Sequence, residues 1–122
     1  MIESIISMEL PAGGHLAIRR NRICPEQETK QCRRISLVSG IHGDELEGQY
    51  ICYETARRVK EHPEYLKGIV DIYPALNPLG IDMASRTVPR LEMDMNRMFP
   101  GDASGDMMER ITAAVVDSII GS

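Results

Sequence analysis

Two residues with metal-binding side chains stand three positions apart in the glycine-containing stretch of residues 39–48. The imidazole of His42 and the carboxylate of Glu45 are both good ligands for zinc, and a catalytic zinc needs three protein ligands and a water. The spacing therefore predicts two ligands of a zinc site, with a third to come from elsewhere. Each residue also has an ordinary interpretation. A histidine at a glycine turn often caps or packs, and a glutamate in the first helical turn favours the positive helix end.

Asp44, between these two residues, could serve the same site indirectly. A carboxylate that accepts the free N–H of a metal-bound imidazole raises the basicity of that ligand and fixes its tautomer. We therefore predict that Asp44 supports His42. Capping of the helix that follows is the alternative, because aspartate is favoured at that position.

A second group of polar residues follows later, at Arg86 and in residues 94–97. A guanidinium group presents a planar fork that matches a carboxylate, and an asparagine beside it adds a donor and an acceptor. Asn96 and Arg97 are therefore predicted to bind a substrate carboxylate, and Arg86 to stabilise the oxyanion of a tetrahedral intermediate. The alternatives are that Arg97 pairs with Asp94 to brace an irregular loop, and that Arg86 is an ordinary solvated arginine.

Elements that could position these side chains are readable on both sides of the first stretch. Residues 35–38 and 69–73 are apolar runs that predict buried strands, and residues 45–61 have the spacing of an amphipathic helix. Strand, helix and strand in this order imply a parallel pair with a right-handed crossover. Ligands bind at the carboxyl edge of such sheets. The apolar residues expected to face the core from the helix are Leu46, Tyr50, Ile51, Tyr53, Ala56 and Val59.

The rest of the chain predicts simpler features. Residues 5–18 favour a hairpin around a proline- and glycine-containing turn, and residues 19–22 and 25–34 are polar enough for a solvated loop or edge. Residues 74–101 have no clear period over most of their length, and a loop of that length usually carries function. Residues 106–120 predict a second helix. Cys52 is expected to be buried, and the late methionines to pack in the core.

Composition limits the class of protein. A chain of 122 residues with 43% apolar and 26% charged residues is typical of one folded domain. A net charge of −4 argues against a nucleic-acid partner. Three cysteines without a C-x-x-C pair fit a reducing cytoplasm. No stretch approaches the roughly 18 apolar residues of a membrane span, so we expect a cytoplasmic protein without a membrane partner.

With both groups of polar residues identified, the chain resembles the amino-terminal part of the succinylglutamate desuccinylase and aspartoacylase family, relatives of the zinc carboxypeptidases. The resemblance covers about residues 35–120, and four segments carry it in this order: residues 40–45, 77–80, 86–89 and 94–101. It implies an α/β fold with three αβα layers and a mostly parallel mixed sheet. It also implies a zinc-dependent hydrolase that cleaves the amide of an N-acyl amino acid or a similar small carboxylate-bearing substrate.

The resemblance also assigns roles to single residues. His42 and Glu45 match the first two zinc ligands, Asn96 and Arg97 match the pair that holds the substrate carboxylate, and Arg86 matches the arginine that polarises the scissile carbonyl. Arg86 is preferred to Arg90 because it stands in an Arg-x-Val-Pro context.

Two parts of the family's site have no counterpart here. The family uses a later histidine as third zinc ligand and a later glutamate as general base, and no histidine follows His62. We therefore expect residues 1–122 to form a single domain that is the amino-terminal fragment of a larger catalytic domain, inactive alone, with the third ligand of one zinc ion outside this chain. An exposed edge strand would favour self-association or marginal stability.

Two other functions fit the same residues. The chain could be a non-catalytic module that binds a carboxylate ligand or a partner on the same fold. It could also be half of a site that another chain completes.

Overall fold

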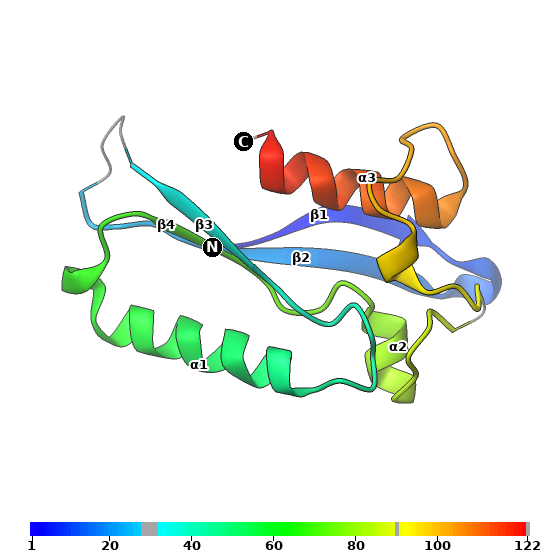
Figure 1. Cartoon of the computed structure of the whole chain (residues 1–122), viewed down its shortest axis with the longest axis horizontal. Coiled ribbons are helices and arrows are strands. Elements are labelled where there is room, and N and C mark those ends of the chain that lie inside the picture. Colours follow the sequence, from blue (N-terminus) through cyan, green and yellow to red (C-terminus); the bar gives the residue numbers. More distant parts are fainter. Residues whose placement is uncertain (28–31, 90, 122) are drawn as a thin grey trace.

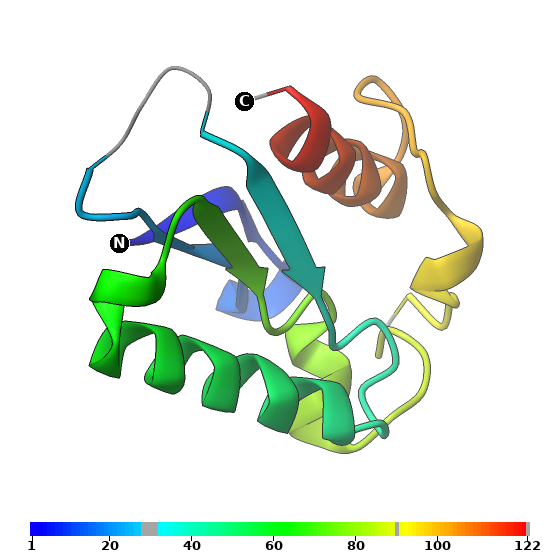
Figure 2. The ribbon, with the colours of Figure 1, turned by 60° about the vertical axis from the view of Figure 1, so that its left-hand side comes forward.

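The computed structural model describes residues 1–27, 32–89 and 91–121. Within them, a four-stranded sheet lies between helix α1 (Glu47–Glu61) on one face and helix α3 (Met107–Ile120) on the other (Figures 1 and 2). The short helix α2 (Pro78–Met83) follows the last strand and lies near the strand ends that carry the loops (Figure 1). The predicted α/β class and its three layers are confirmed.

The strands are β1 (Ile2–Glu9), β2 (His15–Ile23), β3 (Arg34–Val38) and β4 (Ile69–Tyr73), in the spatial order β1-β2-β4-β3. The predicted parallel pair on either side of α1 is confirmed as β3 and β4. The sheet is mixed, as expected. Most pairings among the described strands are nevertheless antiparallel, because the β1–β2 hairpin joins the free side of β4 through β2. The expected parallel majority is corrected accordingly.

The predicted hairpin is present but longer than expected. β1 and β2 pair around a 3-10 turn at Pro11–Gly13, and β2 continues to Ile23. The expectation of a solvated loop or edge is therefore wrong for residues 19–22, which lie within β2, while residues 28–31 of that segment lie outside the described residues. A partner far along the chain explains the difference. Arg22 donates to both carboxylate oxygens of Asp71 on β4, at 2.7 and 2.8 Å, so a charged residue can lie within the sheet.

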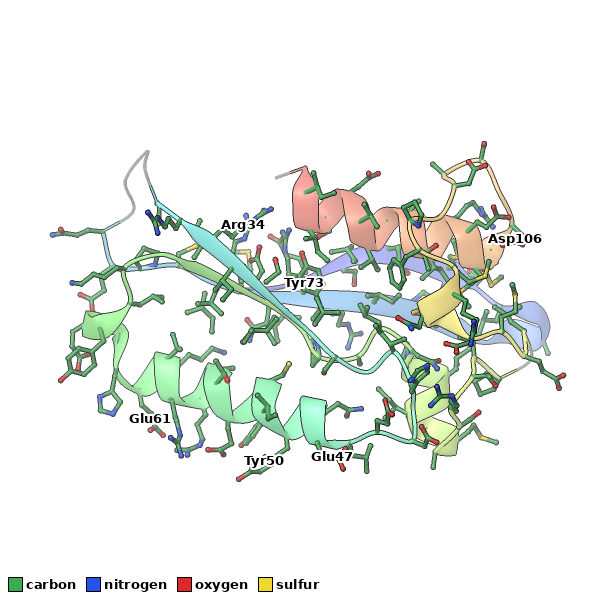
Figure 3. All side chains as sticks on the ribbon, in the orientation of Figure 1. Arg34, Glu47, Tyr50, Glu61, Tyr73 and Asp106 are labelled. Atoms are coloured by element: carbon green, nitrogen blue, oxygen red, sulfur yellow. The ribbon has the colours of Figure 1, made fainter. Side chains whose placement is uncertain are left out.

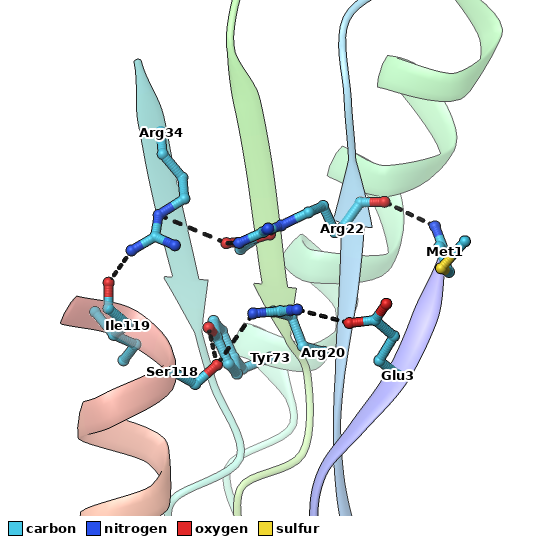
Figure 4. Close-up of polar contacts among 9 residues, drawn as sticks. Met1, Glu3, Arg20, Arg22, Arg34, Tyr73, Ser118 and Ile119 are labelled. Carbon is cyan, nitrogen blue, oxygen red and sulfur yellow. Dashed lines mark hydrogen bonds and ion pairs between the residues drawn. The ribbon is translucent and has the colours of Figure 1, made fainter. Parts of the chain in front are cut away.

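Other arginines of the sheet hold the last turn of α3 (Figure 4). Arg20 donates to Ser118 Oγ at 3.3 Å and to Glu3 at 2.7 Å. The hydroxyls of Tyr73 and Ser118 are 2.7 Å apart. Arg34 donates to the carbonyl of Ile119, where a cation suits the negative end of the helix. These contacts fix α3 across β2, β4 and β3.

The main hydrophobic core lies between α3, the sheet and the loops that follow β4. Its fully buried members are Leu16, Ile18, Tyr73, Leu76, Val88, Met95, Met108, Ile111 and Val115. A smaller cluster of Cys52, Val70 and Ile72 lies under α1. The predicted packing of the late methionines and burial of Cys52 are confirmed. The predicted second helix is confirmed as α3, which begins at a capping box formed by Asp106 and Glu109.

Helix α1 forms as predicted but turns a different side to the sheet. Four apolar residues expected to face the core are instead 58–66% exposed: Leu46, Tyr50, Ile51 and Tyr53. Figure 3 shows Tyr50 on the side of α1 that points away from the sheet. The contact side is set by Gly48 and Cys52. A Cβ on Gly48 would lie 2.9 Å from the Cβ of Ser39, and the Cys52 thiol lies 3.5 Å from the Ser39 hydroxyl.

Candidate metal and substrate site

The loop that carries His42 leaves the sheet at the carboxyl end of β3. The Ser39 amide donates to the Tyr73 carbonyl at 2.9 Å, so the two parallel strands stay paired up to the turn. Gly40 then adopts φ of +76°, and a Cβ there would lie 2.8 Å from the carbonyl oxygen of Pro74. Only glycine fits both the conformation and the space. The chain therefore turns immediately beyond the strand, as predicted for a ligand-binding edge.

Gly43 brings the same loop against α2. A Cβ on Gly43 would lie 2.0 Å from the carbonyl carbon of Gly80, which is closer than any side chain allows. Residues 74–101, predicted as one long loop, thus contain a helix, and its backbone touches the His42 loop. The position of α2 is therefore part of the site's geometry.

His42 and Glu45 face each other as their spacing predicted. His42 Nδ1 lies 3.2 Å from Glu45 Oε2, and on the other side of the ring Nε2 lies 2.8 Å from Asp94 Oδ1. A proton on Nε2 donated to Asp94 leaves the lone pair of Nδ1 directed toward the Glu45 carboxylate. This donor set fits a divalent ion held between His42 Nδ1 and the Glu45 carboxylate. The Asp94 carboxylate would orient the ring from the other side, through Nε2.

Asp94 is the residue whose position the sequence did not reveal. It accepts from His42, and it also accepts from the Asn96 amide at 3.0 Å. The hydrogen bond from His42, helped by that from Asn96, holds the pKa of Asp94 below its ordinary value. Asp44 is exposed in the turn after His42. Its predicted support of His42 stays a prediction, whereas Asp94 makes such a contact.

The arginines predicted for substrate binding reach the same place. Arg86 Nη1 lies 3.9 Å from Glu45 Oε1, and Arg97 Nε lies 3.7 Å from Asp94 Oδ2. Both are too long for hydrogen bonds, and the Arg97 side chain is 83% exposed. Asn96 is also exposed, in the 3-10 turn Met95–Arg97. The structure therefore places Arg86, Asn96 and Arg97 beside the two carboxylates that contact His42. Arg90, the alternative to Arg86, lies outside the described residues.

The two other histidines have partners outside this group of residues. His15 Nε2 lies 2.9 Å from Ser7 Oγ in the β1–β2 hairpin, and His62 lies 3.5 Å from Glu64 just after α1. In the described part of the chain, no three His, Cys, Asp or Glu residues are grouped so that they could hold a metal ion. The site here thus contains two candidate ligands.

An open recess lies beside these ligands. It has a volume of about 250 Å³ and is lined by Val38, Ser39, Gly40, Ile41, His42, Glu45 and Gly48. Two of its lining residues, Gly40 and Gly48, have no side chain, so a small ligand could approach His42 and Glu45. Among the described residues, no helix has the length and apolarity needed to cross a membrane.

The fold and this edge define an α/β chain whose loop after a parallel strand carries a histidine and glutamate pair. The sequence model of the succinylglutamate desuccinylase/aspartoacylase catalytic domain matches residues 31–120. The chain belongs to this family.

Individual relatives agree with this assignment. The N-alpha-acetyl-L-2,4-diaminobutyric acid deacetylase of Halomonas elongata is 36% identical over 75 residues, which are 62% of this chain and 21% of that protein. A succinylglutamate desuccinylase/aspartoacylase structure from Rhodobacter sphaeroides matches with a TM-score of 0.71 and 32% identity, over 88% of this chain and 31% of that one.

A third relative is the product-bound ectoine utilization protein EutE (DoeB) from Ruegeria pomeroyi. It matches with a TM-score of 0.69 and 27% identity, over 88% of this chain and 32% of that one. The chain therefore spans a third or less of the length of these relatives.

Proposed function

We propose that the chain is the amino-terminal part of a zinc-dependent hydrolase. Its substrate would be an N-acyl amino acid or a similar carboxylate-bearing amide, cleaved at a carbon–nitrogen bond that is not a peptide bond. The observation that carries the proposal is the arrangement of His42 between Glu45 and Asp94 at the carboxyl end of β3. Family membership and the deacetylase relative support the same class of reaction.

His42 through Nδ1 and Glu45 through its carboxylate would hold the zinc, together with a third ligand from outside this chain. When bound, zinc lowers the pKa of a coordinated water and polarises the carbonyl to be attacked. This chain's own contribution is positional. Asp94 keeps the His42 proton on Nε2, which fixes the ring and leaves Nδ1 free to ligate.

Arg86, Asn96 and Arg97 would bind the substrate. Arg86 would stabilise the oxyanion on the reacting carbonyl, and Asn96 with Arg97 would hold the substrate carboxylate. The long contacts of Arg86 to Glu45 and of Arg97 to Asp94 support these roles. An arginine that makes no close ion pair can turn toward an anionic ligand at little cost.

Zinc titration of the 122-residue chain against a competing chelator dye tests the metal part of the proposal. We expect one zinc ion per chain, bound weakly because two protein ligands leave coordination positions open. His42→Ala and Glu45→Gln should abolish this binding. His62→Ala is the matched control, because His62 also pairs with a glutamate yet lies outside the site. Binding that survives His42→Ala would contradict the assignment.

Hydrolysis of a panel of N-acyl amino acids, followed by release of the free amine, tests the reaction. The chain alone with zinc should give no turnover. A chimera in which these residues replace the matching segment of the Halomonas elongata deacetylase should give turnover that Arg86→Ala removes. Turnover by the chain alone would show that its own residues complete the site. An inactive but folded and zinc-loaded chimera would count against the hydrolase.

A non-catalytic carboxylate-binding module is the second candidate, favoured by the exposure of Arg97 beside an incomplete ligand set. Isothermal titration with an N-acyl amino acid separates the two functions. Binding that is unaffected by chelators and lost in Arg97→Ala would support the module. Binding that requires both zinc and Arg97 would support the hydrolase.

Self-association of the chain is proposed from the free side of β3, which is an edge strand among the described residues. Ile35 and Val38 of this strand are exposed, and an apolar edge is a ready site for pairing. Sedimentation velocity should show concentration-dependent oligomers that Ile35→Lys reduces. A monomer at all concentrations would contradict this proposal.

A further inference from the structure

Asn77 is buried between the two loops that carry the candidate site. Its Nδ2 donates to the carbonyl of Ile41 at 3.3 Å and to the carbonyl of Thr87 at 3.1 Å. Its Oδ1 accepts from the Gly80 amide at 2.9 Å, which caps the first turn of α2. The side chain is 1% exposed. Both carboxamide donors are therefore used, and each is bonded to a different loop.

The two carbonyls stand beside residues of the site. Ile41 precedes His42, and Thr87 follows Arg86. The Asn77 backbone amide adds a third tie, because it donates to the Gly40 carbonyl at 2.8 Å. We propose that Asn77 is a positioning residue that sets the distance between the His42 loop and the Arg86 loop. Its role in catalysis rests on the proposed function, whereas the tie between the loops does not.

The side chains of Arg86 and Glu45 are too loosely joined to set this distance themselves. Arg86 and Glu45 are both more than half exposed and stand 3.9 Å apart. The hydroxyl of Ser85 also donates to the Thr87 carbonyl, at 3.2 Å, but that bond stays within one loop. Buried hydrogen bonds such as those of Asn77 hold better, because leaving their groups unpaired is costly. The carboxamide thus joins the candidate ligand to the candidate oxyanion-binding arginine.

Asn77→Asp removes the two hydrogen bonds that join the loops but can keep the one that caps α2. Aspartate has the same shape and caps helices as well as asparagine does, so the bond from the Gly80 amide can persist. The second carboxylate oxygen would instead face the carbonyl oxygens of Ile41 and Thr87, where it has no proton to donate. Asp106→Asn is the matched control. It makes the reverse exchange at the cap of α3, where the bonded partner is Glu109.

Nuclear magnetic resonance of the 122-residue chain tests the tie without any metal. In the unchanged chain, the Asn77 carboxamide protons should exchange at least about tenfold more slowly than those of exposed Asn96, because they are buried and bonded. They should also show cross-relaxation to Ile41 and Thr87. In Asn77→Asp, the backbone amides of His42 and Arg86 and the His42 ring nitrogens should shift, while the Gly80 amide stays protected. Asp106→Asn should leave all of them unchanged.

Zinc titration then measures the consequence for the site. Asn77→Asp should lower zinc affinity by about 10- to 100-fold, as changes around metal ligands do, and Asp106→Asn should not. Three results would overturn the inference. The first is a folded Asn77→Asp whose His42 and Arg86 resonances do not move. The second is measurable zinc binding by the unchanged chain that has the same affinity in that variant. The third is rapid exchange of the Asn77 carboxamide in the unchanged chain, which decides the question if the variant does not fold.

Failure of the proposed function is a different result. If the unchanged chain binds no zinc but the resonances of His42 and Arg86 move in Asn77→Asp as expected, the zinc site is wrong and the tie between the loops stands.

Discussion

Two clusters of this chain pair arginine with a carboxylate, but they differ in burial and in contact distance. Under α3, Asp71 is completely buried and Arg22 bonds both of its oxygens, at 2.7 and 2.8 Å. These bonds raise the pKa of Arg22 above its ordinary value. At the carboxyl end of the sheet, the contacts of Arg86 and Arg97 to carboxylates are 3.9 and 3.7 Å long, and both side chains are exposed.

The difference separates charged residues that stabilise the fold from charged residues that remain available to bind a ligand. A carboxylate removed from water depends on its partners, so the Asp71 cluster cannot exchange them without cost to folding. Arginines that remain in water can bind an anion while the fold stays intact. The two clusters should therefore respond differently to the same substitution.

Matched aspartate-to-asparagine changes should reveal the largest difference in the free energy of unfolding. Asp71→Asn should lower the free energy of unfolding by about 3 kcal/mol or more, because it leaves Arg22 without its buried counter-charge. Asp94→Asn should lower it far less, since the Asp94 carboxylate is itself 18% exposed and Arg97 beside it lies largely in water. Urea unfolding at pH 7 measures both. Equal losses in the two variants would remove the distinction between the clusters.

Gly43→Ala should have the next largest effect on the free energy of unfolding, and it should also change the candidate metal site. The new methyl group would meet the backbone of Gly80 at 2.0 Å, and overpacking of this kind costs about 1–3 kcal/mol. The His42 loop must move, so zinc affinity should fall as well. Gly13→Ala is the control. It adds strain at φ of +80° but meets nothing within 4 Å, so it should destabilise the hairpin and leave zinc binding unchanged.

Asp94→Ala and Asp44→Ala compare the two carboxylates that could orient His42. Because Asp94 lies 2.8 Å from His42 Nε2, its removal should lower zinc affinity by about tenfold. Asp44→Ala should have the smaller effect, since Asp44 is exposed in the turn. Chelator competition with zinc measures both variants. A larger loss in Asp44→Ala would restore the role predicted from sequence.

Local patterns predicted much of this fold, and contacts between distant segments account for the rest. The strands β3 and β4 and the helix α3 follow from apolar runs and a capping residue, which act within a few positions. The extension of β2 through Arg22 depends on Asp71, which is 49 positions away. No local pattern could show that pairing, although a lone aspartate within the apolar run of residues 69–73 was a signal of it.

The candidate site divides in the same way. The facing of His42 and Glu45 follows from their i and i+3 spacing, and their position at the strand end follows from Gly40. The contact of Asp94 with His42 crosses 52 positions, so the sequence offered the adjacent Asp44 instead. The orientation of α1 was also hidden, because it depends on the fit of Gly48 against Ser39 and not on helical periodicity.

A third group of charged residues lies exposed on α1, and substitution there should have the smallest effect on the free energy of unfolding. Arg57 donates to Glu54 and Glu61, and its hydrogen bond lowers the pKa of Glu54 below the ordinary value. A lowered pKa in the folded chain stabilises it above the unfolded value of about 4.3, and this contribution is lost as pH falls through the folded pKa. Arg57→Gln should therefore raise the Glu54 pKa toward its ordinary value, with the remainder held down by Arg58, which lies 3.5 Å from Glu54.

The same variant should change the free energy of unfolding less than any other proposed here. Its small difference from the unchanged chain should shrink further at pH 3, where Glu54 is protonated in the unfolded chain, and in 1 M salt, where charges in water are screened within about 3 Å. A carbon-detected titration of the Glu54 carboxyl and urea unfolding at the two pH values measure these effects. If Arg57→Gln destabilised the chain as strongly as Asp71→Asn, burial would not be what distinguishes the charges that hold this fold.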